Sequence, residues 1–282
     1  MQSGMSDASE PAVPGIGLTV SNGLAETLAA IQAEIDPGKR EEMLTAMVNS
    51  YAANEIPLVL ALLQSSESSD FTEELSARLL RRWAQCDVHA AAVWAEALPD
   101  GALRKRALGG VAAEWADHEP AQAETWARQL PRVTERLEAL GSIASAFIRT
   151  DPVESIRLVA TDLLPDARRD VLLRHAAMEW ASQDGKNAAK WAQQIEVGLL
   201  REQVIAAVAT AWSEREPIPA ATFLLAELPV GRTHDDAVIG IVQRWSQQDP
   251  AQAADWVKQF PEGELRKTAI DEIANNTPKR SN

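Results

Sequence analysis

The chain has 282 residues, 46% of them hydrophobic, and a net charge of −14 from 27 basic and 41 acidic side chains. Nucleic-acid binding needs clustered positive charge, so this balance argues against a DNA- or RNA-binding protein. No run of 18 apolar residues occurs, and we therefore expect no membrane-spanning helix.

Acidic side chains are concentrated near the N-terminus. The first hundred residues hold 15 acids and 5 bases, so most of the negative charge lies there. This distribution is compatible with ordinary solubility. It also favours a basic partner that docks near the N-terminal end.

The chain begins with segments that precede any periodic pattern. Residues 1–21 are rich in proline and glycine and are predicted to form a disordered leader. A single helix is expected over about 22–35, before the Asp-Pro-Gly turn at 36–38. From about residue 39 to residue 260 the sequence then repeats.

The repeat is marked by tryptophan. All nine tryptophans stand in two columns, each with a period of 32 or 33 residues, and the second column follows the first by eleven residues. The first column is Tyr51, Trp83, Trp115, Phe147, Trp180, Trp212 and Trp245, and the second is Leu62, Trp94, Trp126, Leu158, Trp191, Phe223 and Trp256. A fixed period of this length indicates an array of helical repeats.

Each repeat is predicted to contain two helices, an A helix and a B helix. Apolar or small side chains recur eight, seven, four and three residues before each first-column aromatic, which is one face of the A helix. An acid stands four residues after that aromatic in every repeat, often followed by proline, as at the start of a B helix. These junction acids are Glu55, Asp87, Glu119, Asp151, Asp184, Glu216 and Asp249.

A small side chain follows each junction acid by four residues in all repeats but the first, which has Val59 there. Such a residue lets two helices approach closely. The small residues are Ala91, Ala123, Ser155, Ala188, Ala220 and Ala253. Most B helices are expected to end at a Leu-Pro or Phe-Pro pair, because proline prevents continuation.

The ends of the array depart from the repeat. Residues 65–70 are expected to form a longer loop. A last helix over about 263–275 lacks the tryptophan and is predicted to be a capping helix. The expected organisation is a disordered leader (1–21), an α-helical repeat domain (22–276) and a polar tail (277–282). The predicted fold is all-α, a right-handed α-solenoid of about seven antiparallel helix pairs with terminal capping helices.

The spacing of an aromatic, an acid four residues later and alanine four residues after that, as in Trp115, Glu119 and Ala123, resembles the helix junction of tetratricopeptide-like α-solenoids. The resemblance covers about 22–276, with a period of 32–33 rather than 34 and without the family's Trp-x-x-Leu-Gly opening. The Leu-Pro endings and the acid-proline junctions are also similar to Trp-rich repeats of uncharacterised bacterial proteins. The resemblance implies binding of a protein or peptide.

A basic column stands eleven residues before each first-column aromatic and continues into the last helix. Its members are Arg40, Thr72, Arg104, Arg136, Arg169, Arg201, His234 and Arg266. In a structural interpretation, which we favour, each arginine pairs with a capping acid or with a B-helix carbonyl of a neighbouring repeat. In a functional interpretation the basic column is exposed and binds acidic peptides or carboxylate tails.

A second set of candidate binding positions lies on the A helices. Five residues before the aromatic most repeats have a small side chain, but Arg78 and His175 stand there, and Arg174 adjoins His175. The candidate peptide-binding residues are Arg78, Arg174, His175, Arg136, Arg169 and Arg201. Ordinary surface variation is the competing explanation for the first three.

We find no pattern that predicts catalysis, a metal ion or a cofactor. The four histidines fall in different repeats, no zinc-binding spacing occurs, and there is no glycine-rich phosphate loop or nucleophile elbow. Cys86, the single cysteine, is expected to be buried. The absence of disulfides fits the cytoplasm, with the periplasm or secretion as the alternative if a leader was removed before Met1.

The predicted function is a non-enzymatic scaffold or adaptor that binds a protein or peptide on the concave face of the array, and the acidic N-terminal region favours a basic partner. One alternative is an assembly component that self-associates through the ends of the solenoid. A second alternative is an enzyme or a nucleic-acid-repair protein on a similar helical scaffold. The sequence leaves the partner and the oligomeric state open.

Overall fold

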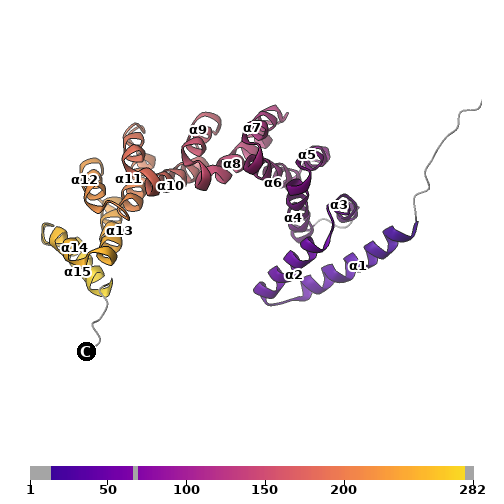
Figure 1. Cartoon of the computed structure of the whole chain (residues 1–282), viewed down its shortest axis with the longest axis horizontal. Coiled ribbons are helices and arrows are strands. Elements are labelled where there is room, and N and C mark those ends of the chain that lie inside the picture. The colour runs from indigo at the N-terminus through magenta and orange to yellow at the C-terminus, as the bar shows by residue number, and fades with distance from the viewer. Residues whose placement is uncertain (1–13, 66–68, 277–282) are drawn as a thin grey trace, which may run out of the picture. The chain divides into compact units, whose positions relative to one another are not determined.

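The computed structural model describes residues 14–65 and 69–276, which form 15 α-helices and no strand (Figure 1). The prediction of an all-α protein is therefore confirmed. The chain divides into two compact units, Met1–Trp115 and Ala116–Asn282, and each is described by itself. No helix of the described residues combines the length and the apolar character needed to cross a membrane.

Unit 1 contains six helices, the last of which continues a few residues into unit 2. They are α1 (Pro14–Ala33), α2 (Pro37–Ser50), α3 (Ile56–Ser65), α4 (Asp70–Cys86), α5 (Val88–Ala97) and α6 (Ala102–His118). Helix α2 packs against α1 and α4, and α4 packs against α3 and α5. The long helices of neighbouring repeats are thus in direct contact, and the short ones pack beside them.

The first helix begins earlier than expected. The sequence predicts a start at about residue 22 after a disordered leader, but α1 begins at Pro14. Proline is readily accepted at the first helical position, because its missing N–H would have no partner there, so Pro14 opens a helix instead of breaking one. Residues 1–13 of the predicted leader, residues 66–68 of the predicted loop and the predicted tail lie outside the described residues.

Unit 2 contains the remaining helices. They are α7 (Pro120–Gln129), α8 (Val133–Thr150), α9 (Pro152–Asp162), α10 (Ala167–Ala192), α11 (Leu199–Trp212), α12 (Pro217–Glu227), α13 (Arg232–Gln248), α14 (Pro250–Val257) and α15 (Glu264–Asn276). The A helices α8, α10, α11, α13 and α15 pack one against the next. The short helices α9, α12 and α14 each pack against the long helices that precede and follow them.

The junction acids adopt one backbone conformation wherever their torsion angles are known. From Asp87 to Asp249 their φ values lie between −134° and −148° and their ψ values between 67° and 87°. Asp184 shares it, so the continuous span α10 is an A helix and a B helix joined at a kink. Four of these carboxylates accept the backbone N–H three residues later at 2.9–3.2 Å. Glu119 and Glu216 form no such bond. The predicted start of the B helix is therefore confirmed, and the predicted side-chain cap is confirmed at the four aspartates.

The residues four positions after each junction acid, which we call the small column, lie buried in every repeat. All seven of its residues, Val59 included, are 0% exposed. In Ser155 the buried hydroxyl donates a 2.7 Å hydrogen bond to the carbonyl of Ala144 on the preceding helix. Small side chains at this position therefore let the B helix lie directly on the A helix, as the sequence predicts.

The tryptophan columns pack as core. Trp115 and Trp245 are buried and the other seven are half-buried. The two columns meet within a repeat, with ring centroids 6.3 Å apart in Trp180 and Trp191 and 5.6 Å apart in Trp245 and Trp256. Cys86 departs from expectation: it is exposed, because it ends α4 beside the junction acid and not on the apolar face.

Candidate functional site

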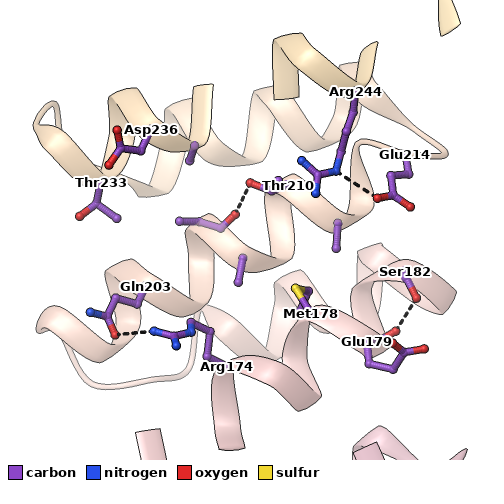
Figure 2. A pocket seen from close by; sticks show the side chains of 14 residues that line it. Arg174, Met178, Glu179, Ser182, Gln203, Thr210, Glu214, Thr233, Asp236 and Arg244 are labelled. Atoms are coloured by element: carbon purple, nitrogen blue, oxygen red, sulfur yellow. Dashed lines mark hydrogen bonds and ion pairs between the residues drawn. The ribbon is translucent and has the colours of Figure 1, made fainter. Parts of the chain in front are cut away.

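A groove of about 650 Å³ lies on the A helices of unit 2, across α10, α11 and α13 (Figure 2). We call it the alanine groove. Its lining comprises Arg174, Met178, Glu179, Ser182, Gln203, Ala206, Ala207, Thr210, Ala211, Glu214, Thr233, Asp236, Ala237 and Arg244. The groove arises where three successive A helices lie side by side and the residues between them are small.

The middle of the groove is formed by α11 and is nearly free of long side chains. Ala206 and Ala207 are half-buried and Ala211 is buried. Thr210 turns its hydroxyl back to the carbonyl of Ala206, to which it donates a 2.7 Å hydrogen bond. Methyl groups therefore face the space, and a ligand could approach the α11 backbone closely.

Charged side chains stand at the two ends of the groove (Figure 2). At one end Arg244 Nε donates to Glu214 Oε1 at 3.0 Å, so that α11 and α13 are joined by an ion pair. At the other end Arg174 Nη1 donates to the amide oxygen of Gln203 at 3.5 Å. Within the described part of the chain, Arg174 forms no ion pair.

Three other half-buried arginines of unit 2, Arg136, Arg169 and Arg201, belong to the basic column. Arg136 donates to the carbonyl oxygens of Leu130 and Pro131, at 2.7 and 3.1 Å. Arg201 pairs with Glu227 at 2.7 Å, and Arg169 lies 3.8 Å from Asp170. Of these arginines Arg174 is the one that lines the alanine groove, where its described contact is with the uncharged Gln203 amide.

The six predicted binding residues therefore lie in different environments. Arg174 lines the alanine groove, whereas the neighbouring His175 is exposed and outside its lining. Arg136 and Arg201 are occupied by contacts within the chain, and Arg169 has a buried Nε with no acceptor among the described residues. The contacts of Arg136 are those that the structural interpretation of the basic column expects.

Arg78, the sixth predicted residue, lies in unit 1 in a smaller hollow of about 290 Å³. Its guanidinium pairs with Glu41 at 2.6 Å and with Glu74 at 2.8 Å, and Arg106 approaches Glu74 at 3.5 Å. The hydrogen bond to Arg78 lowers the pKa of Glu41, and the bonds to Glu41 and then Glu74 raise the pKa of Arg78. This surface of unit 1 is a network of ion pairs around a hollow smaller than the alanine groove of unit 2.

Several groove residues escaped the sequence analysis, among them Met178, Glu179, Gln203 and Thr210. Gln203 stands nine residues before its first-column aromatic, Met178 and Thr210 stand two before theirs, and Glu179 stands one before. A stripe of this spacing is the exposed face of an A helix, so its positions are recognisable in the sequence. What the sequence does not supply is the depth of the surface, which depends on how α10, α11 and α13 pack.

No family model, no curated protein and no solved structure matches this chain.

Proposed function

We propose that this protein is a non-enzymatic adaptor that binds a peptide segment of another protein in the alanine groove. The proposed framework is a right-handed α-solenoid of about seven antiparallel helix pairs, of the tetratricopeptide-like kind. The A-to-A packing within unit 2 supports it, because that packing places α10, α11 and α13 side by side. The concave surface of such an array would be the A-helix face.

The observation that carries the proposal is the contrast between the groove and the rest of the A-helix surface. A hollow of about 650 Å³ with a methyl-lined middle and polar ends has the composition of a recognition site, in which polar groups fix orientation and apolar groups supply contact area. In repeat proteins of this kind, ligands bind along the surface that successive repeats share.

The proposal is tested by filling the groove. Ala206 and Ala77 occupy the same position of the sequence repeat, both are half-buried, and both line a hollow, one in each unit. A random peptide library displayed on phage is selected on the full chain and on its Ala206→Trp and Ala77→Trp variants, with circular dichroism as a check of folding. We expect the selected peptides to bind the wild type and the Ala77→Trp variant and not to bind the Ala206→Trp variant.

The acidic N-terminal region supports a second, weaker contact with the same partner. With 15 acids against 5 bases in the first hundred residues, we expect basic segments of a partner to associate there. Binding of a full-length partner should then weaken as salt is raised from low ionic strength to about 0.5 M, because screening shortens the reach of surface charges. A salt-independent affinity would exclude this contribution.

A further inference from the structure

Two charged side chains of the alanine groove come from the same helix, α10. Arg174 donates to the Gln203 amide at 3.5 Å, and Glu179 accepts from the Gln183 amide at 3.3 Å. Both side chains are half-buried, and within the described residues neither forms an ion pair. A partly desolvated charge without a counter-charge is unfavourable, and a ligand that supplies the opposite charge recovers that energy.

The other charged groups of the groove are already compensated. Arg244 pairs with Glu214 at 3.0 Å, and Asp236 lies 3.7 Å from Arg232. The positive and the negative charge that remain available are therefore those of Arg174 and Glu179, at opposite ends of the α10 wall (Figure 2). A complementary ligand carries one acidic and one basic group.

Along the axis of α10, Arg174 and Glu179 are about as far apart as two same-side positions of an extended chain. Five residues of an α-helix rise about 7.5 Å, at 1.5 Å per residue. In an extended peptide, side chains two positions apart point to the same side and are separated by about 6.7 Å. In a helical ligand, opposite charges on one face stand three or four residues apart and neutralise each other, which makes them poorer partners for the groove.

The middle of the groove fits the same ligand. Between the two charges the groove presents Ala206, Ala207 and Thr210, whose hydroxyl is turned back to its own helix. A narrow extended backbone can lie over these methyl groups, whereas a helix with side chains is about 10 Å across.

We propose that the alanine groove recognises an extended peptide with an acidic and a basic side chain two positions apart. The acid contacts Arg174 and the base contacts Glu179. This proposal rests on the proposed peptide-binding function and specifies the chemistry of its ligand.

The experiment selects seven-residue peptides from a random display library on the full chain, with the Ala206→Trp variant as counter-selection. We expect the enriched peptides to carry Asp or Glu two positions from Lys or Arg. An enriched peptide is then synthesised with a fluorescent label in four forms: unchanged, with its acid replaced by the corresponding amide, with its base replaced by glutamine, and with both replaced.

Fluorescence polarisation with charge-neutral variants assigns each contact. Arg174→Gln should weaken binding of the unchanged peptide about tenfold, as expected for a charge-assisted hydrogen bond, and leave the peptide without the acid unaffected. Glu179→Gln should weaken binding of the unchanged peptide by a similar factor and leave the peptide without the base unaffected. His175→Gln is the matched control, since His175 is exposed next to Arg174 and outside the groove lining, and it should bind all four peptides as wild type does.

The outcomes are distinguishable. This inference is overturned if the enriched peptides fail to bind Ala206→Trp but lack the charge pair. It is also overturned if their affinity is the same for Arg174→Gln, Glu179→Gln and wild type. In both cases the proposed peptide binding still stands. Failure to enrich any peptide over the Ala206→Trp background overturns the proposed function itself.

Discussion

The A-helix surfaces of the two units share the same sequence positions and differ in chemistry. In unit 1 the stripe carries Arg78 and Arg106, which share Glu74 as an ion-pair partner. In unit 2 the corresponding stripe has alanines in its middle and leaves Arg174 without an acid among the described residues. The core columns hold the helices in both units, so surface residues are free to decide whether a hollow is closed by ion pairs or open to a ligand.

This comparison shows where function can be located in a repetitive protein. Residues that recur in every repeat, such as the small column and the junction acids, explain packing. The groove is lined by residues of the exposed A-helix stripe, whose identities vary from repeat to repeat. Four predictions test this separation between recurring structural positions and individual binding positions.

The largest effect is expected at Gly185, the first residue of the B helix after Asp184. A methyl group there would lie 2.1 Å from the indole of Trp212 on the next A helix, so Gly185→Ala must displace a packed ring. We expect a loss of about 2–3 kcal/mol of unfolding free energy, measured by urea denaturation.

Gly110 in unit 1 provides the matched control for that substitution. A methyl group at Gly110 would meet no atom within 4 Å, and the residue is inside α6. Gly110→Ala should therefore stabilise the protein by about 0.5–1 kcal/mol. Equal effects of the two substitutions would contradict the close approach at Gly185.

Arg136 and Arg174 should differ in stability, since one is occupied by its own chain and the other is open. Arg136→Ala removes hydrogen bonds to two carbonyl oxygens at the end of α7, which we expect to cost about 1–2 kcal/mol. Arg174→Ala should change the unfolding free energy by less than about 0.5 kcal/mol. Thermal melting curves of the two variants measure this difference. A large destabilisation by Arg174→Ala would show that Arg174 has a structural role.

The ion pair between α7 and α9 should give unit 2 a measurable acid sensitivity. Burial raises the pKa of Asp162, but the hydrogen bonds from Arg128 and Thr161 outweigh it, and the folded pKa lies below the ordinary value of 3.8. The pair therefore stabilises the folded state above about pH 4–5, and this contribution is lost as pH falls through the folded pKa.

The test compares wild type with Asp162→Asn in urea at several pH values. Because the pair at 3.0 Å is partly exposed to solvent, we expect a difference of only about 0.5 kcal/mol near pH 6 that shrinks toward pH 3. A difference that stays constant over this range would rule out the ion pair as its source.

Only a small stability effect is expected at Glu74, although its substitution should change the surface of unit 1. Glu74→Ala removes the carboxylate shared by Arg78 and Arg106 and should alter the unfolding free energy by less than about 1 kcal/mol. If ion pairs are what close this surface, the variant should gain salt-sensitive binding of a heptaglutamate peptide, measured by fluorescence polarisation. Adding Arg78→Ala to the variant should abolish that gain.

Individual residues show how far the site could be predicted. Arg174 was recognised because it adjoins His175, which interrupts a column of small residues, and it lines the groove. Arg136 and Arg201 were recognised from their period, but a period alone cannot tell whether a guanidinium meets a carbonyl of its own chain or a ligand. Glu179 and Thr210 carry no mark in the sequence, because they lie on an exposed stripe whose residues vary freely.

The sequence by itself determined the all-helical fold, the start of each B helix at its junction acid and the burial of the small column. These features depend on local hydrogen bonding and on apolar spacing within one repeat, both of which are written in neighbouring residues. Only the tertiary structure decided that Arg78 pairs with Glu41 and that α10, α11 and α13 enclose a groove. Those outcomes depend on residues about 30 positions apart and on the space left between helices, and no local pattern encodes either.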